Sequence, residues 1–388
     1  MAFNSITGMS EHHRRAYKLL SGAPQTLSKQ GIWTFGAPSV LGLYLRTGCS
    51  LRQTVENMQE CMPPYYLLSG WHGAGAAELT EAEALLLQGR IDEMDMPLQK
   101  ACYQAEKHGQ ECITICCDFL EMQRDLFRDV YSSKAEAYSR NQWQLQPWKQ
   151  SMLLNTADMC AGFYYALLGK PEYIPSWLTD GNGQQPSVLY PARPCRNYIS
   201  AQCLLAQGQY TELLVRWSDW EQECRPYSNF LCLLYLQVQR AAAFAGRGDV
   251  TSCRASLKQA LEMAEADKLV LPLAQNIALL RPYLEQEAQG EYSATAAAAL
   301  HLGQQLEAGR GQIMSARFAE AGLQELTEQE LQIAQLAAAR HTNREIAQRL
   351  SLSEGTIKQY LNKIFAKLQI DAAAKNKRHQ LERFFPNS

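Results

Sequence analysis

Glycine-containing turns that follow apolar helical runs recur at a regular interval along the N-terminal part of this 388-residue chain. Gly169, Gly208 and Gly248 lie 39 and 40 residues apart, and Gly89 lies 80 residues before Gly169. The midpoint of that longer interval, at Asp129, has similar flanks without the glycine. Such an interval is typical of arrays in which each unit is a pair of helices too small to bury its own apolar face. The spacing therefore predicts an all-α solenoid whose stacked units share one core.

The segments after these turns have the apolar spacing of amphipathic helices. After Gly248, for example, the apolar positions are Leu257, Ala260, Leu261 and Ala264, which fall on one face of a helix. This part of the chain resembles a tetratricopeptide-type array with longer than standard helices.

A different pattern begins near residue 326. Thr327 with Glu330 and Thr342 with Glu345 are Thr-x-x-Glu capping boxes, in which side chains satisfy the first backbone N–H groups of a helix. They predict helices that begin at about residues 328 and 343. Ser353 is a third N-cap, and the three-residue turn 351–353 before it restricts the angle between the second and third helices.

The third predicted helix has one apolar face and one polar face. Its apolar residues recur at spacings of four, three and four: Ile357, Leu361, Ile364 and Leu368. Lys358, Gln359, Asn362 and Lys363 project on the other side. Gln and Asn side chains can pair with adenine, and Lys with guanine acceptors or phosphate, so this face suits the major groove of DNA.

These segments, 326–331, 343–350 and 351–358 with Lys367-Leu368, resemble the LuxR-type helix-turn-helix of bacterial transcriptional regulators. The resemblance implies a small four-helix DNA-binding domain with no catalytic residues, no metal and no cofactor. Carried onto this sequence with the face described above, it gives as DNA-binding residues Asn343, Thr356, Lys358, Gln359, Asn362, Lys363, Lys367 and Arg378. The alternative for this segment is an ordinary charged helical hairpin at the end of the solenoid.

Three positions depart from the family pattern. Arg340 stands after the first helix, where Gly is usual because the backbone turns left-handed. Gly355 stands where a basic or polar residue is common, and Gln369 where Gly usually follows Lys-Leu. These departures concern the detailed DNA contacts rather than the fold.

The charge distribution agrees with a DNA-binding C-terminus. The whole chain has a net charge of −2, which argues against a generally basic nucleic-acid coat. Residues 355–388, however, carry seven basic and two acidic residues. The positive charge is thus concentrated on the third helix and the residues that follow it.

The twelve cysteines all precede residue 254 and lack metal-ligand spacing, so we expect reduced, buried thiols, with redox sensing or disulfides as the alternatives.

No signal peptide and no apolar run long enough for a membrane span is found, which predicts a cytoplasmic protein. His72, in a glycine-rich run, is expected in a turn rather than in an oxyanion loop or a metal site.

Together the segments 31–36, 65–75, 158–162 and 174–178 and the LuxR-type tail resemble MalT-like regulators, in which an ATPase domain precedes a helical sensor and a DNA-binding end. No Gly-x-x-x-x-Gly-Lys-Ser/Thr occurs in this sequence, so ATP switching is not carried over.

Aromatic residues are frequent in the repeat region, where helical spacing favours packing and a ligand groove is the alternative. They include Trp143, Trp148, Trp177, Trp217, Trp220, Tyr164, Tyr165, Tyr198 and Tyr235.

The sequence thus predicts residues 1–290 as a tetratricopeptide-like sensor, 291–324 as a helical linker with a hinge at 309–311, and 325–388 as the DNA-binding domain. The expected partners are double-stranded DNA, a second copy of the chain when DNA is bound, and an unidentified small-molecule effector or protein in the solenoid groove. An interaction scaffold with a degenerate DNA-binding tail is the alternative function, and an enzyme is the third.

Overall fold

The computed structural model describes Arg15, Lys18, residues 31–139, 147–180, 188–324 and 326–368, Ile370 and Leu381. Within these residues every regular element is a helix, which confirms the all-α fold predicted from the sequence. The chain divides into two compact units, Met1–Ala308 and Gly309–Ser388. None of the described helices is both long enough and apolar enough to span a membrane.

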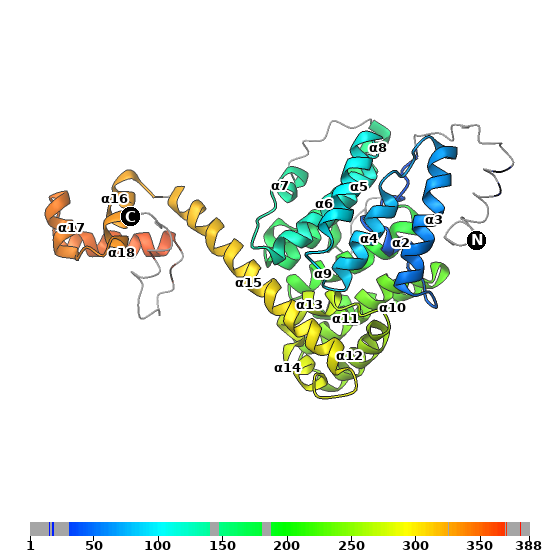
Figure 1. The fold of residues 1–388 in the computed structure, drawn as a ribbon. Coiled ribbons are helices and arrows are strands. Elements are labelled where there is room, and N and C mark those ends of the chain that lie inside the picture. Colours follow the sequence, from blue (N-terminus) through cyan, green and yellow to red (C-terminus); the bar gives the residue numbers. More distant parts are fainter. Residues whose placement is uncertain are drawn as a thin grey trace. The chain divides into compact units, whose positions relative to one another are not determined.

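The first unit is a succession of helices that pack on their neighbours along the chain (Figure 1). Its main helices are α3 (Leu51–Ser69), α4 (Ala76–Leu87), α5 (Asp95–Lys107), α6 (Glu111–Phe127), α8 (Pro147–Leu168), α9 (Arg193–Ala206), α10 (Tyr210–Cys224), α11 (Phe230–Gly246), α12 (Val250–Glu265) and α14 (Ile277–Glu287). Shorter helices are α2 (Leu41–Tyr44), α7 (Ser133–Ser139), α13 (Leu271–Gln275) and the 3₁₀ turns η1 (Pro171–Tyr173), η2 (Ser176–Leu178), η3 (Tyr190–Ala192) and η4 (Arg225–Tyr227). Helix α15 (Ser293–Gln324) is continuous through residues 309–311. The hinge predicted at these residues is not tested by this observation and stays a prediction.

Many helices of the first unit end with one residue in the left-handed conformation. These residues are Gly89, Gly109, Asp129, Gly169, Gly208, Ser228, Gly248 and Lys268, so the intervals are about 20 residues or twice that. The residue after each one donates its backbone N–H to the carbonyl five residues earlier, as from Val130 to Asp125 at 3.0 Å. This bond satisfies a carbonyl that the helix itself leaves unpaired. The φ of 59° at Asp129 confirms the turn predicted where the glycine is missing.

Helix α11 lies at the centre of the first unit, in contact with α9, α10, α12, α13 and α14. The predicted amphipathic face of α12 is confirmed, because Leu257, Ala260, Leu261 and Ala264 are all buried. Several of the aromatic residues are buried: Tyr164, Tyr165, Tyr198, Tyr235 and Trp220. Trp143 and the side chain of Trp148 lie outside the described residues.

The cysteines are free, and ten of the twelve are buried, as predicted. His72 has a structural role, because one ring nitrogen lies 2.9 Å from the carbonyl oxygen of Gly31 and the other 2.7 Å from the Tyr65 hydroxyl. These contacts join the turn after α3 to the start of the described segment. Within the described residues, no group of three or more His, Cys, Asp or Glu side chains is placed to hold a metal ion.

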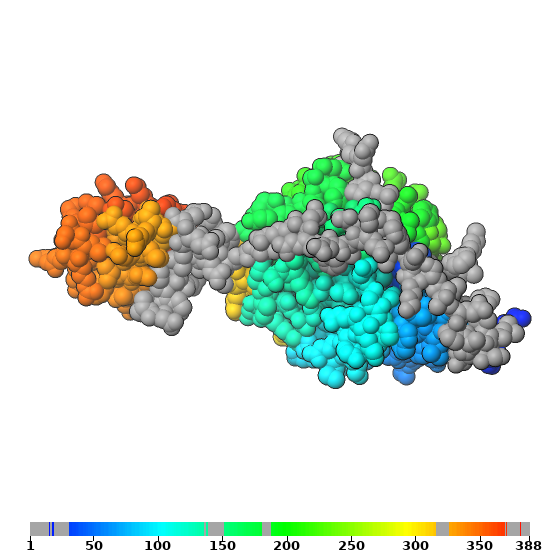
Figure 2. All heavy atoms as spheres, turned by 90° about the horizontal axis from the view of Figure 1, so that it is seen from above, coloured from blue at the N-terminus to red at the C-terminus, as the bar shows by residue number. Residues whose placement is uncertain are grey.

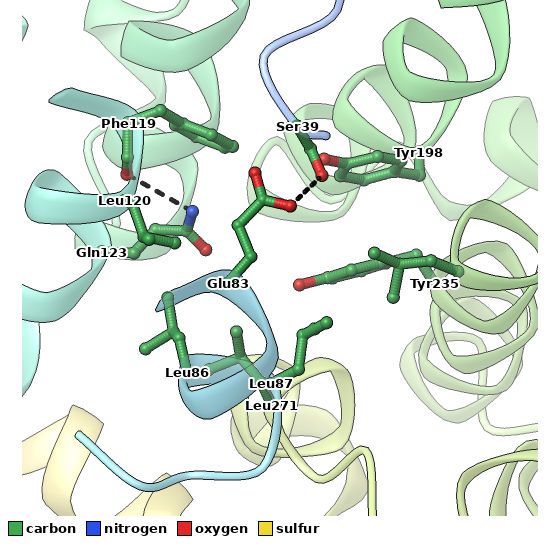
Figure 3. A pocket seen from close by; sticks show the side chains of 11 residues that line it. Ser39, Glu83, Leu86, Leu87, Phe119, Leu120, Gln123, Tyr198, Tyr235 and Leu271 are labelled. Carbon is green, nitrogen blue, oxygen red and sulfur yellow. Dashed lines mark hydrogen bonds between the residues drawn. The ribbon is translucent and has the colours of Figure 1, made fainter. Parts of the chain in front are cut away.

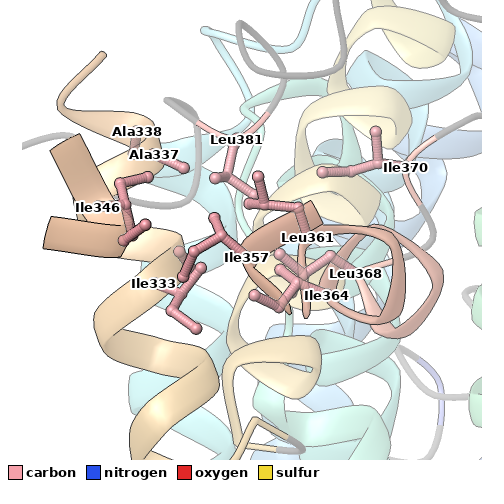
Figure 4. Close-up of a cluster of buried hydrophobic side chains, with 12 residues drawn as sticks. Ile333, Ala337, Ala338, Ile346, Ile357, Leu361, Ile364, Leu368, Ile370 and Leu381 are labelled. Carbon is pink, nitrogen blue, oxygen red and sulfur yellow. The ribbon is translucent and has the colours of Figure 1, made fainter. Parts of the chain in front are cut away.

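The second unit contains α16 (Glu328–Ala338), α17 (Asn343–Leu350) and α18 (Glu354–Lys367). Figure 2 shows its described atoms, in orange and red, gathered in one compact body. Its core is drawn in Figure 4 and consists of Ile333, Ala334, Ala337, Ala338, Ile346, Ala347, Ile357, Leu361, Ile364, Leu368, Ile370 and Leu381. Apart from Leu381, the residues on which the predicted fourth helix of this domain falls lie outside those that the structure describes.

Candidate nucleic-acid interface

Both predicted capping boxes are present. At the start of α16, the Glu330 backbone N–H donates to Thr327 Oγ1 (3.3 Å) and the Thr327 N–H donates to the Glu330 carboxylate (2.8 Å). The same exchange joins Thr342 and Glu345 at the start of α17, at 3.3 and 2.7 Å. These reciprocal bonds satisfy the first free N–H groups of each helix. They explain why α16 and α17 begin at the predicted residues.

The turn between α17 and α18 is closed by backbone and side-chain hydrogen bonds. Ser351 takes the left-handed conformation (φ 55°), and the Leu352 N–H donates to the Ala347 carbonyl at 2.9 Å. Ser353 Oγ then accepts the Thr356 N–H at 3.0 Å, as an N-cap does. The turn predicted at 351–353 is confirmed, and it leaves little freedom in the angle between the two helices.

Helix α18 presents two faces, as its sequence predicts. Ile357, Leu361 and Ile364 are at most 4% exposed and enter the core of the second unit (Figure 4). The side chains of Lys358, Gln359, Asn362 and Lys363 are exposed to solvent. Lys358 and Asn362 are four residues apart, as are Gln359 and Lys363, so the four side chains share one face of the helix. That face offers two ammonium groups and two amides, which can donate to or accept from base edges.

The other predicted DNA-binding residues lie around this face in different settings. Asn343 is half-buried at the first position of α17. Thr356 is half-buried in the first turn of α18, with Oγ1 2.7 Å from Ser353 Oγ. Arg378 lies outside the described residues.

Lys367 has a partner that sequence reasoning missed. Its ammonium group lies 2.6 Å from the carboxylate of Glu330, the same buried side chain that completes the first capping box. The ammonium group, together with the Thr327 N–H, lowers the pKa of Glu330 below its usual value. The two residues are 37 positions apart, so no local pattern indicates the pair. Lys367 therefore joins the end of α18 to the start of α16, and its contact with DNA stays a prediction.

Two of the departures from the family pattern can now be located. Arg340 has a φ of 65°, and the following His341 N–H donates to the Leu336 carbonyl at 3.1 Å. The left-handed position predicted at Arg340 is thus confirmed. At Gly355, a Cβ atom would meet only Ser353 Oγ, at 3.7 Å, so the site has room for a side chain. Gln369 lies outside the described residues.

The comparison with known families agrees with this geometry. Residues 324–375 match the model of the family GerE, described as bacterial regulatory proteins, luxR family. The second unit contains a luxR-family helix-turn-helix domain. Domains of this family bind DNA, and α18 is the third helix of the matched segment. No curated protein and no solved structure matches the chain.

Proposed function

We propose that this chain is a bacterial transcriptional regulator that binds double-stranded DNA through α18 and is controlled by its helical N-terminal part. The observation that carries the proposal is the polar face of α18, with Lys358, Gln359, Asn362 and Lys363 exposed opposite the buried Ile357, Leu361 and Ile364. In this proposal Lys358, Gln359 and Asn362 contact base edges in the major groove. Thr356, Lys363, Asn343 and Arg378 lie nearer the phosphates.

The helical N-terminal part is proposed as the sensor. Its turns recur at about 20 residues and its helices pack on their neighbours, which supports a tetratricopeptide-like repeat. Membership of the MalT-like class is part of the proposal and depends on the resemblance of the sequence segments. An effector bound there would change self-association and bring two DNA-binding domains to paired half-sites. The proposal gives the chain no catalytic activity and no cofactor.

The alternative is an interaction scaffold whose C-terminal domain no longer binds DNA. It is favoured by Gly355, which offers no side chain in the first turn of α18, and by the pairing of Lys367 with Glu330. A scaffold would retain the folded domain and lose its affinity for DNA.

The salt dependence of DNA binding separates the two functions. We expect the wild-type protein to bind duplex DNA more weakly as salt increases, since cationic side chains release counterions from the phosphates. Lys363→Ala should lower the slope of log affinity against log salt by about one. Lys100→Ala, which removes an exposed charge from α5, is the matched control and should leave the slope unchanged. Equal slopes for all three proteins, or no binding at low salt, would favour the scaffold.

A further inference from the structure

The first unit contains a cavity of about 30 Å³ at the meeting point of α4, α6, α9, α11 and α13 (Figure 3). A water molecule needs roughly 10–15 Å³ by the same measure, so the space exceeds that of one water. Leucine and phenylalanine side chains form most of its wall, with Leu86, Leu87 and Phe119 among them. Few polar groups line the wall, so these groups determine which class of ligand the cavity can bind.

Glu83 is the first of these polar groups. Its carboxylate is fixed by the backbone N–H groups of Val40 (2.9 Å) and Leu41 (2.7 Å) and by the Ser39 hydroxyl (3.2 Å). These bonds occupy one lone pair of Oε1 and both lone pairs of Oε2. One acceptor position on Oε1 is therefore left over. Burial raises the pKa of Glu83 to about 7, although the backbone hydrogen bonds favour its charged form.

Tyr198 and Tyr235 are the second polar feature. Their rings are stacked at 4.5 Å, and the side chains are 3% and 4% exposed. Figure 3 shows both rings directed toward Glu83. Neither hydroxyl has a hydrogen-bond partner among the described residues, although each can donate once and accept twice. Leaving such buried groups without partners is unfavourable, so the cavity favours a ligand that bonds to them.

The charged groups in the wall determine whether a cationic or an anionic ligand is favoured. Glu83 is the one acidic side chain among the residues that line the cavity, and no Lys, Arg or His is among them. The other titratable groups that face Glu83 are Cys116 on α6, Tyr198 on α9 and Tyr235 on α11. Burial raises the pKa of each above its usual value, so all three stay neutral near pH 7. Helix α13 contributes only the apolar Leu271. An anion would face the carboxylate without a counter-charge, whereas a cation would be paired.

We propose that this cavity binds a small protonated primary amine. An ammonium group has three donors, and the wall offers three acceptors for them: the free position on Glu83 and the hydroxyl oxygens of Tyr198 and Tyr235. The apolar side chains would surround the carbon end of the molecule. A protonated amine would then be the effector of the proposed regulator. The binding itself does not depend on the proposed function, whereas an effect of the amine on DNA binding does.

Binding at this position would stabilise the packing of distant segments. The cavity joins Ser39, before α2, to Glu83 on α4, Tyr198 on α9 and Tyr235 on α11. A ligand that bonds to all of these segments favours conformations of the first unit in which the segments lie close together. Binding therefore increases the population of those conformations.

The test uses the full-length protein without DNA, in an amine-free sodium phosphate buffer. Methylammonium chloride is titrated by calorimetry and by thermal shift, with sodium acetate, methanol and potassium chloride as matched additives at constant ionic strength. We expect a saturable rise in melting temperature with methylammonium alone. No saturable binding would overturn the proposal. Equal binding of potassium would overturn it in favour of a monovalent metal cation.

Two tyrosine variants show whether the ligand occupies this cavity. Tyr235→Phe removes a hydroxyl without a partner, so the melting temperature of the ligand-free protein should stay the same or rise, while affinity for methylammonium falls about tenfold. Tyr164→Phe is the control, because the Tyr164 hydroxyl accepts the Ser132 N–H at 3.1 Å. That variant should melt earlier and keep its affinity. Equal affinity in wild type and Tyr235→Phe would contradict the assignment.

The protonation of Glu83 gives an independent readout. An ammonium group pairs with the carboxylate form, which is lost as pH falls below about 7. Affinity should therefore fall by up to about tenfold per unit between pH 7 and pH 6 and level off above pH 8. An affinity for methylammonium that does not change with pH would contradict the cavity proposal. Because this experiment measures ligand binding alone, its failure would not bear on the proposed DNA binding.

Discussion

The helix ends of the second unit and the cavity of the first unit differ in the distance along the chain over which their polar contacts are made. In the second unit, the groups that start and end α16, α17 and α18 lie three to five residues apart, as Thr327 and Glu330 do. In the first unit, the cavity depends on contacts such as Ser39 to Glu83, 44 residues apart, and Gln275 to Gln123, 152 residues apart. Local contacts leave a pattern in the sequence. Distant contacts do not, so the helix starts of the DNA-binding domain could be predicted from the sequence, whereas its Lys367–Glu330 pair and the cavity could not.

The largest expected effect tests whether the units are stabilised separately. Ile364→Ala removes a fully buried side chain from the core of the second unit, which should destabilise that unit by about 2–5 kcal/mol. Leu280→Ala is the matched change in α14 of the first unit. Hydrogen exchange by mass spectrometry should show lost protection only in the unit that carries each change. Loss of protection in both units from either variant would mean that their stabilities are coupled.

A smaller effect is expected from the hydrogen bonds and the ion pair of Glu330. Its pKa is depressed in the folded state by Lys367 and the Thr327 N–H, so its stabilisation is fully present above the unfolded pKa of about 4.3 and is lost as pH falls through the lower folded value. Removing the cap with Thr327→Ala should cost about 0.5–2 kcal/mol at neutral pH.

Glu330→Gln should flatten the acid side of the stability profile of the second unit between about pH 5 and pH 3. Glu328→Gln, exposed in the same first turn, is the control for simple loss of charge. A wild-type profile that is unchanged by Glu330→Gln would show that the carboxylate does not stabilise this helix.

The left-handed helix ends allow a direct comparison of the two units. Arg340 (φ 65°) in the second unit and Asp129 (φ 59°) in the first occupy positions that favour glycine. Arg340→Gly should stabilise its unit by up to about 1 kcal/mol, and Asp129→Gly by less, because Asp tolerates this conformation better than Arg. Thermal melts of both variants give the comparison. Clear destabilisation by Arg340→Gly would mean that contacts of the arginine side chain outweigh the backbone strain.

The smallest expected effect is that of ATP. Since the sequence has no phosphate-binding loop, millimolar ATP should not change the melting temperature, because only a ligand that binds the native state raises its stability. A saturable shift would overturn this prediction and restore nucleotide switching to the mechanism.

Particular residues show what the sequence could and could not predict. The starts of α16, α17 and α18 follow from side chains that cap their own helix, and all three were predicted. The left-handed Arg340 was predicted from the family resemblance, since Gly is usual at that position. The turn at Asp129 was predicted from the interval between glycines. The pair Lys367–Glu330 was missed because it forms only when α16 and α18 pack together. Residues whose contacts depend on tertiary packing leave no periodic pattern.

One residue of the sequence does indicate a polar site in this part of the first unit. Helix α4 has three glutamates, and Glu83 is the one at helical spacing from the buried Leu79 and Leu86. A buried carboxylate needs hydrogen-bond donors, so such a residue indicates a polar site. Its partners, Val40 and Leu41, contribute backbone groups, which no side-chain pattern could reveal.

The central claim is that the exposed face of α18 reads DNA bases. Its most direct test is the selection of bound duplexes from a random pool by wild type, by Asn362→Ala and by Gln332→Ala, which removes an exposed amide from α16. We predict that wild type and Gln332→Ala enrich the same motif. Asn362→Ala should lose preference at one base pair, with a cost of about 1–3 kcal/mol. If the folded wild-type protein enriches no motif at any salt concentration, or if Asn362→Ala enriches the wild-type motif unchanged, α18 does not read DNA as proposed.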